Sequence, residues 1–219
     1  MEQFLLEKSL SNVMNQTEQI LDHSHTMLAQ SIKAFFASDR HMSSSVIHTL
    51  EKRMNELEVI LEEKCIETIA IHQPRAKHLR RLTMLIKINN DIERMGDLAM
   101  SIASHNIELI ELNKEQPLTK DFLSDLANET LKIHMLMREA FLEEDTKKAI
   151  AVIENDARIN LLRDNAIKTV ASQFQKESNS FDTFYALIRI IQRLERVGDL
   201  CKNIAEDILY IVDGSIYKH

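Results

Sequence analysis

The sequence predicts an all-α protein made of two tandem three-helix repeats that form an antiparallel up-down helical bundle. Three observations support this fold class. The 219 residues include only three glycines and two prolines, so the chain has few helix breakers. Apolar residues recur at helical spacing over long stretches. The seven-residue phrase at 92–98 returns in closely similar form at 194–200.

Six helices are expected from the apolar spacing and from the turn residues between them. We expect them to end near residues 36, 71, 112, 142, 174 and 212. The separating residues are capping residues, prolines, a polar loop and a terminal glycine: Ser38, Asp39, Pro74, Pro117, Glu144, Asp145, the stretch 177–180 and Gly214.

The two repeats are expected to cover residues 1–114 and 115–219. Each has an aromatic-containing segment followed by a turn aspartate, Asp39 in the first half and Asp145 in the second. A β-branched pair lies seven residues beyond each aspartate. The third helix of each half then carries the sequence Glu-Arg-x-Gly-Asp-Leu.

The repeated phrase places a glycine and two acids inside a helix, where both are unfavourable. A glycine costs about 0.5–1 kcal/mol relative to alanine there, and like charges four residues apart cost a few tenths of a kcal/mol. Because both costs recur at equivalent places, we expect another part of the chain to approach Gly96 and Gly198 closely. Small residues on the glycine face of each helix favour close helix packing as the reason.

The acids Glu93, Asp97, Glu195 and Asp199 lie beside that packed face, so their charge needs an offset. One solution is a bound cation, since carboxylates four apart on a helix can both reach a hard metal ion. The other is an internal salt-bridge network with Arg94, Arg196 and lysines. The residues alone leave both solutions open.

Further acids could complete such a site on the second helix of each repeat. Asp156 lies eleven residues after Asp145. The first half has Leu50 at that offset and Glu51 next to it, so an equivalent site needs a shift of one residue. The chain has no E-x-x-H, no H-E-x-x-H, no P-loop and no C-x-x-C, so the sequence indicates no di-iron oxidase, zinc protease or nucleotide-binding enzyme.

Composition excludes several other classes. The net charge is −7 and no basic run is present, so we expect no nucleic-acid partner. No run of 18 apolar residues occurs, so we expect no insertion into a membrane. Two isolated cysteines, Cys65 and Cys201, indicate a reducing compartment, and Cys201 is expected to be a small buried residue. The simplest location is the cytoplasm.

The doubled motif resembles that of the PhoU family of phosphate-signalling regulators. The resemblance extends to Gln73-Pro74-Arg75-Ala76 with Leu79-Arg80, and to a family-like ending that includes residues 203–206, 210–212, Gly214 and His219. The chain departs from the family at Leu200, where histidine is usual, and at His78, where aspartate is usual.

The resemblance implies a non-enzymatic, cytoplasmic negative regulator of phosphate uptake and phosphate-starvation signalling. It implies a metal-binding adaptor between the phosphate ABC transporter and a sensor histidine kinase, at the inner face of the membrane through these partners. Divalent or trivalent ions such as iron or zinc, also as clusters, are implied on Glu93, Asp97, Glu195 and Asp199. Asp156 matches the family's acid on the second helix of a repeat. We also expect a homodimer.

Three alternatives remain. The first is a PhoU-like accessory module of another phosphate or ion transporter. The second is a metal-free helical interaction module, in which the acids form ion pairs. The third is an enzyme that uses a carboxylate-bound metal to activate water, which needs a further ligand or base that the sequence does not reveal.

Overall fold

A computed structural model describes residues 2–112, 120–176 and 181–213 of the chain. Within these ranges nearly every residue is helical and no strand is present. In chain order the elements are α1 (Glu2–Ala37), α2 (Arg40–Ser45), a π-helical turn (Val46–Leu50), α3 (Glu51–His72), α4 (Lys77–Leu112), a 3-10 turn (Asp121–Leu123), α5 (Ser124–Glu143), α6 (Thr146–Lys176) and α7 (Phe181–Asp213). The all-α prediction is confirmed.

The six predicted helices end within two residues of the observed ends. The second of them is not a regular helix, because α2, the π turn and α3 follow one another from Arg40 to His72. The predicted helix start at Pro117, the loop at 177–180, the cap at Gly214 and the repeat boundary at 114/115 lie outside the described residues.

The first two helices of each repeat are joined by the same tight turn. Ser38 and Glu144 both adopt a left-handed backbone with φ of 50°. The next residue, Asp39 or Asp145, donates its N–H to the carbonyl five residues earlier, at 2.9 and 3.0 Å. The Asp39 carboxylate then accepts the backbone N–H of Met42 at 2.9 Å, which caps α2.

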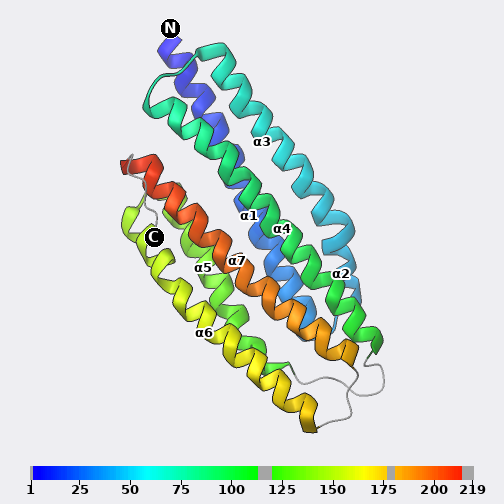
Figure 1. Cartoon of the computed structure of the whole chain (residues 1–219). Coiled ribbons are helices and arrows are strands. Elements are labelled where there is room, and N and C mark those ends of the chain that lie inside the picture. The colour runs from blue at the N-terminus through cyan, green and yellow to red at the C-terminus, as the bar shows by residue number, and fades with distance from the viewer. Residues whose placement is uncertain (1, 113–119, 177–180, 214–219) are drawn as a thin grey trace.

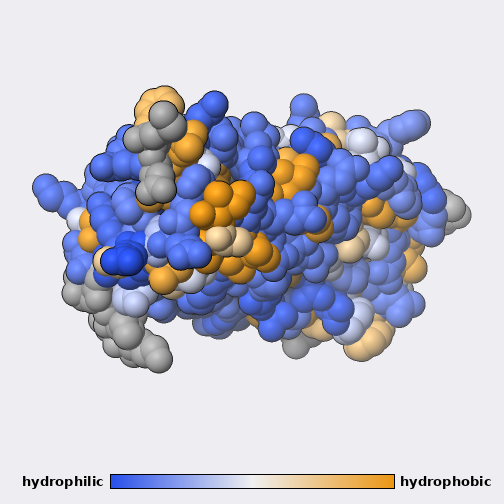
Figure 2. Space-filling view, turned by 90° about the horizontal axis from the view of Figure 1, so that it is seen from above, coloured by the Kyte–Doolittle hydropathy of each residue, from blue (hydrophilic) through white to orange (hydrophobic). Residues whose placement is uncertain are grey.

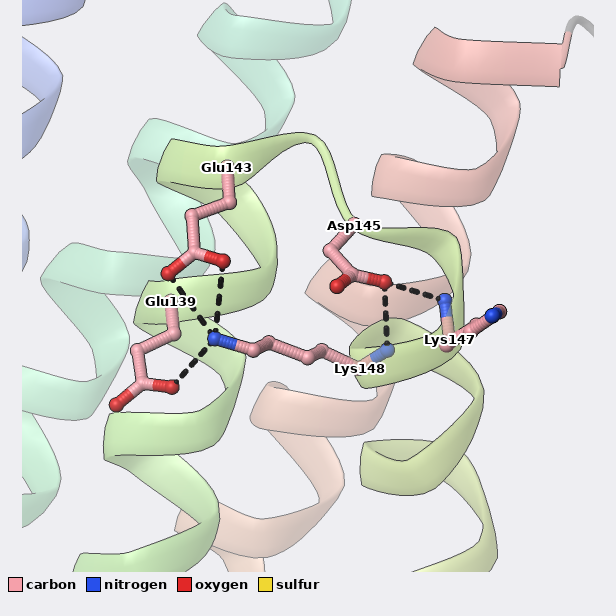
Figure 3. Close-up of polar contacts among 5 residues, drawn as sticks. All are labelled: Glu139, Glu143, Asp145, Lys147 and Lys148. Atoms are coloured by element: carbon pink, nitrogen blue, oxygen red, sulfur yellow. Dashed lines mark hydrogen bonds and ion pairs between the residues drawn. The ribbon is translucent and has the colours of Figure 1, made fainter.

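The turn of the second repeat carries an additional ion-pair cluster (Figure 3). Asp145 accepts the backbone N–H groups of Lys147 and Lys148 at 2.8 and 3.2 Å, which caps α6. The Lys148 ammonium reaches back across the turn to Glu139 at 2.8 Å and Glu143 at 3.0 Å. These contacts confirm the predicted break at residues 144–145.

The second helix of the first repeat contains one extra residue. In the π turn the N–H of Glu51 bonds to the carbonyl of Val46, five residues earlier instead of four. The equivalent helix of the second repeat, α6, has no such turn among its described residues. After the π turn, equivalent positions on the second helices of the two repeats are therefore shifted by one residue along the sequence.

Two helices at the centre of the bundle, α4 and α7, join the repeats (Figure 1). On one side α1 and α3 pack against α4, and on the other α5 and α6 pack against α7. A second contact between the repeats links α1 to α5. The buried side chains of all these helices form one continuous apolar core.

Polar contacts between the central helices show their register, and two of them involve side chains on both helices. The Lys87 ammonium of α4 lies 2.6 Å from a carboxylate oxygen of Asp207 on α7. Further along, Nε of Arg193 on α7 donates to the Ser101 hydroxyl on α4 at 3.0 Å. Because these contacts run in opposite order along the two helices, α4 and α7 are antiparallel. The same register sets the two repeated glycines level with each other.

The surface seen from above is mostly hydrophilic, with hydrophobic residues in separate patches (Figure 2). Over the described residues, none of the helices combines the length and the apolar character that crossing a bilayer requires. Both cysteines are buried and unpaired, so the predicted burial of Cys201 is confirmed.

Candidate functional site

The repeated glycines are sites of close approach, as predicted. A Cβ added at Gly96 would lie 3.0 Å from Cγ of Met54, and one at Gly198 would lie 2.8 Å from Cδ1 of Ile159. Both approaching groups are side chains from the second helix of the same repeat. The glycine therefore makes room for a large side chain. The sequence predicted instead that the backbone of a neighbouring helix would approach it.

These glycine contacts establish which acids are equivalent in the two repeats. Met54 lies three residues after Glu51, and Ile159 lies three residues after Asp156. Since Met54 and Ile159 fill the same space beside the glycine, Glu51 is the counterpart of Asp156. The π turn supplies the one-residue shift that this equivalence needs.

Four carboxylates of α3 and α4 form what we call the first acidic cluster: Glu51, Glu58, Glu93 and Asp97. Burial, and then the charges of Asp97, Glu58 and Glu51, raise the pKa of Glu93 to about 7. Burial and the Asp97 charge also raise the pKa of Glu51. One buried oxygen of Glu51, Oε2, has no hydrogen-bond partner among the described residues. Like charges thus face one another without full compensation.

The arginine inside the first motif does not neutralise this cluster. Arg94 instead bonds to the buried carboxylate of Asp91 at 3.2 Å, one helical turn earlier. Its effect on Glu93 is the smallest of the charge effects on that residue. Within the described residues, no lysine, arginine or histidine forms an ion pair with any member of the first acidic cluster.

Three carboxylates of α6 and α7 form the second acidic cluster: Asp156, Glu195 and Asp199. Two cations lie within it. Arg163 of α6 bonds to Glu195 in an ion pair that is largely shielded from solvent, and the Lys202 ammonium lies 3.1 Å from Asp156. Burial, and then Glu195 and Asp156, still raise the pKa of Asp199, while Lys202 and Arg163 lower it. This cluster is a salt-bridge network.

The difference between the clusters traces to two pairs of equivalent positions. Glu58 follows Glu51 by seven residues, and Arg163 follows Asp156 by seven. Three residues after the motif aspartate, the first repeat has Met100 and the second has Lys202. Sequence reasoning named neither Glu58 nor Arg163. Their spacing of two helical turns from the second-helix acid is the signal that could have identified them.

The structure thus brings the predicted site residues together in two groups. Glu93 and Asp97 join Glu51 and Glu58, and Glu195 and Asp199 join Asp156. Across the described ranges, no three His, Cys, Asp or Glu side chains converge closely enough to hold one metal ion as they lie. Binding by the first acidic cluster therefore requires its glutamates to change rotamer, with some loss of side-chain entropy.

Comparison with known proteins identifies the family. The PhoU domain model matches residues 17–105 and 123–208. The chain is 27% identical to the phosphate-specific transport system accessory protein PhoU of Serratia marcescens, covering 96% of this chain and 85% of that protein. It is 28% identical to the PhoU homolog 1 of Thermotoga maritima, covering 97% and 90%.

Solved structures of PhoU proteins have the same fold as this chain. The crystal structure of PhoU from Pseudomonas aeruginosa superposes with a TM-score of 0.89 at 23% identity, over 95% of this chain and 99% of that one. The phosphate transport system regulatory protein PhoU from Streptococcus pneumoniae gives 0.84 at 21% identity, over the whole of both chains. With both repeated motifs inside the matched segments, the chain belongs to the PhoU family.

Proposed function

We propose that this chain is an accessory protein of a phosphate transport system that represses phosphate uptake and the phosphate-starvation response. In this role it is an adaptor between the phosphate ABC transporter and a sensor histidine kinase. The observation that carries the proposal is the match to the PhoU model across both halves of the chain, each of which includes a Glu-Arg-x-Gly-Asp helix. The link to phosphate transport is supported by the similarity to the phosphate-specific transport system accessory protein PhoU of Serratia marcescens.

We further propose that a divalent or trivalent metal ion binds the first acidic cluster and that none binds the second. The residues that would hold it are Glu51, Glu58, Glu93 and Asp97. The unpartnered Oε2 of Glu51 and the raised pKa of Glu93 support this assignment, because a cation would relieve both. A bound ion would supply positive charge there. In the second acidic cluster the fit is poor, since Arg163 and Lys202 already occupy that role.

The regulatory role is tested in the organism that encodes the chain. Deleting the gene should raise phosphate uptake and a starvation-promoter reporter during growth in abundant phosphate, and the intact gene should restore repression. A reporter that stays repressed in the deletion strain contradicts the role as a negative regulator. Cross-linking in the same strain should recover the phosphate transporter and its sensor kinase; recovery of a different ion transporter would favour the accessory-module alternative.

The metal assignment is tested by elemental analysis of protein purified from that organism. The paired substitution Glu93→Gln with Asp97→Asn should remove the bound metal. The matched pair Glu195→Gln with Asp199→Asn, which changes the same charges in the second repeat, should leave it in place. Equal metal content in both double variants would contradict binding at the first acidic cluster.

A further inference from the structure

A cavity of about 490 Å³ lies between α4 and α7, beside the two repeated motifs. Both repeats line it with equivalent residues, so the cavity follows the internal symmetry of the chain. The matching pairs are Arg94 with Arg196, Asp97 with Asp199, and Ser101 with Asn203. Two lining residues have no lining counterpart. Arg193 is equivalent to Asp91 of the first repeat, and Met100 is equivalent to Lys202 of the second. We call this cavity the seam pocket.

Three guanidinium groups therefore meet in the seam pocket, and most of their donors are unused. Arg196 is exposed and makes no hydrogen bond or ion pair with any residue that the structure describes. Arg193 is half-buried and uses only Nε, on the Ser101 hydroxyl. Arg94 pairs with Asp91 through one of its nitrogens. Since a guanidinium carries five N–H donors, the pocket is rich in charged donors that have no acceptor among the residues described.

The two carboxylates at the pocket do not serve as those acceptors. Asp97 and Asp199 also line the cavity, yet neither forms an ion pair with Arg94, Arg193 or Arg196 in the described structure. Each is electrostatically coupled to the acidic cluster of its own repeat. Mutual repulsion is visible in Arg193: burial, and then the charges of Arg189 and Arg196, lower its pKa. In the part of the chain that the structure describes, no carboxylate acts as a shared counter-ion for the three guanidinium groups.

We propose that the seam pocket binds a tetrahedral oxyanion: inorganic phosphate or the phosphoryl group of a phosphomonoester. Guanidinium groups recognise such anions through paired N–H···O bonds, and the neutral side chains of Ser101 and Asn203 can donate alongside them. The cavity is larger than a free phosphate requires, so it has room for the organic part of an ester. This inference stands on the pocket's own charges and is independent of the role in transport.

Calorimetric titration of the purified protein with inorganic phosphate and, separately, with glycerol 3-phosphate tests the proposal. The titrations use phosphate-free buffer at low ionic strength, where ion-pair recognition is strongest. At least one of the two ligands should bind. Tighter binding of glycerol 3-phosphate identifies an esterified phosphoryl group as the ligand class, and tighter binding of inorganic phosphate identifies the free ion.

Variants locate the binding. Arg196→Gln should weaken binding of the preferred ligand by about tenfold or more, and adding Arg193→Gln should weaken it further. Arg53→Gln removes the same charge from an exposed position on α3 outside the pocket and should change binding less than about twofold. Arg196 is exposed and has no partner among the described residues. Its replacement should therefore leave the circular dichroism spectrum and melting temperature unchanged.

Two results overturn the proposal. One is that neither ligand binds the folded wild-type protein at millimolar concentration. The other is that Arg196→Gln and the double variant bind as tightly as wild type, which would place the anion elsewhere. Neither result bears on the reporter experiment in cells, so failure of the pocket and failure of the regulatory role are distinguishable.

Discussion

In the first repeat, four carboxylates face one another across α3 and α4 without an ion pair from any described lysine or arginine. In the second repeat, Arg163 and Lys202 lie among three carboxylates that occupy equivalent positions. The helix motif is the same in both. The charges placed around it by neighbouring turns and by the second helix are different.

The motif alone therefore does not decide which cations lie beside its acids. A Glu and an Asp four residues apart create a negative surface that must be neutralised. Two positions outside the motif decide whether a protein cation lies beside these acids. In the first repeat, Glu58 and Met100 supply no positive charge to neutralise the motif acids. In the second repeat, Arg163 and Lys202 supply it. The sequence posed metal ion and salt bridge as alternatives. The second repeat shows the salt bridges, and the metal ion is our proposal for the first.

The largest expected effect is the loss of bound metal when Glu58 of the first acidic cluster is replaced by the residue found at the equivalent position of the second repeat. Glu58→Arg places a cation where the second repeat has Arg163, and should eliminate the metal detected by elemental analysis. Glu63→Arg makes the same charge change at an exposed position on α3 and should retain the metal. Full metal content in Glu58→Arg would break the comparison between the two clusters.

A second difference between the repeats, at a buried position of their first helices, should make the stability of the protein sensitive to acid. His134 of α5 is buried where α1 has Leu28, and burial, then His25 and Arg138, lower its pKa to about 3. The unfolded chain takes up this proton near pH 6.5, whereas the folded chain resists it. Stability is therefore complete above pH 6.5 and is lost as pH falls toward 3, by on the order of a few kcal/mol.

Urea unfolding at several pH values measures this loss. His134→Leu, which copies the first repeat, should reduce the fall in unfolding free energy between pH 6.5 and 4. The neighbouring hydroxyl of Ser24, which lies 3.2 Å from the ring, can bond within its own helix in the variant. An unchanged pH profile in His134→Leu would mean that other groups cause the acid sensitivity.

Removing Arg163, one of the two cations of the second acidic cluster, should lower the stability of the protein moderately. Arg163→Met keeps the length of the stem but leaves Glu195 unpaired in a half-buried setting, which should lower the free energy of unfolding by about 1–3 kcal/mol. Chemical denaturation measures the change. The control is Lys168→Met, which removes a positive charge from an exposed position on α6 that has no ion pair among the described residues. If divalent ions then stabilise Arg163→Met more than wild type, the second cluster has acquired the property proposed for the first.

Replacing either repeated glycine by alanine should give the smallest losses of stability. The loss should be larger at Gly198 than at Gly96. Ala at Gly198 would press on Cδ1 of the β-branched Ile159 at 2.8 Å, with an expected loss of about 1–2 kcal/mol. Ala at Gly96 meets Cγ of Met54 at 3.0 Å and its terminal Cε at 3.1 Å. Because this side chain is unbranched and can adjust, relief of the glycine cost offsets the crowding. Thermal melts of the two variants should separate them; a larger loss for Gly96→Ala contradicts the packing explanation.

Most of the fold could be predicted because its determinants are local. Helical spacing, scarce helix breakers and capping residues such as Asp39 and Asp145 fix where helices run and turn. The π turn at Val46–Leu50 could not be predicted from periodicity, since its apolar pattern differs from that of an α-helix by a single residue. The sequence indicated only that Glu51 needs a one-residue shift to match Asp156. The bond from the Glu51 N–H to the Val46 carbonyl and the fit of Met54 against Gly96 reveal how the chain makes that shift.

The candidate site was predictable only in part. The four motif acids were identified from their repetition, and Asp156 from its offset after Asp145. Glu58 and Arg163 were missed because each acts on a carboxylate of a different helix, and contacts between helices depend on packing. The seam pocket also depends on packing, because it exists only where α4 and α7 lie antiparallel.

The central claim is that equivalent motifs bind a metal ion in one repeat and ion-pair within the protein in the other. Anomalous diffraction from crystals grown with Mn²⁺ tests it most directly. The account predicts an anomalous peak beside Glu51, Glu93 and Asp97, and none beside Asp156, Glu195 and Asp199. Peaks of equal height in both repeats, or a peak in the second alone, would contradict it.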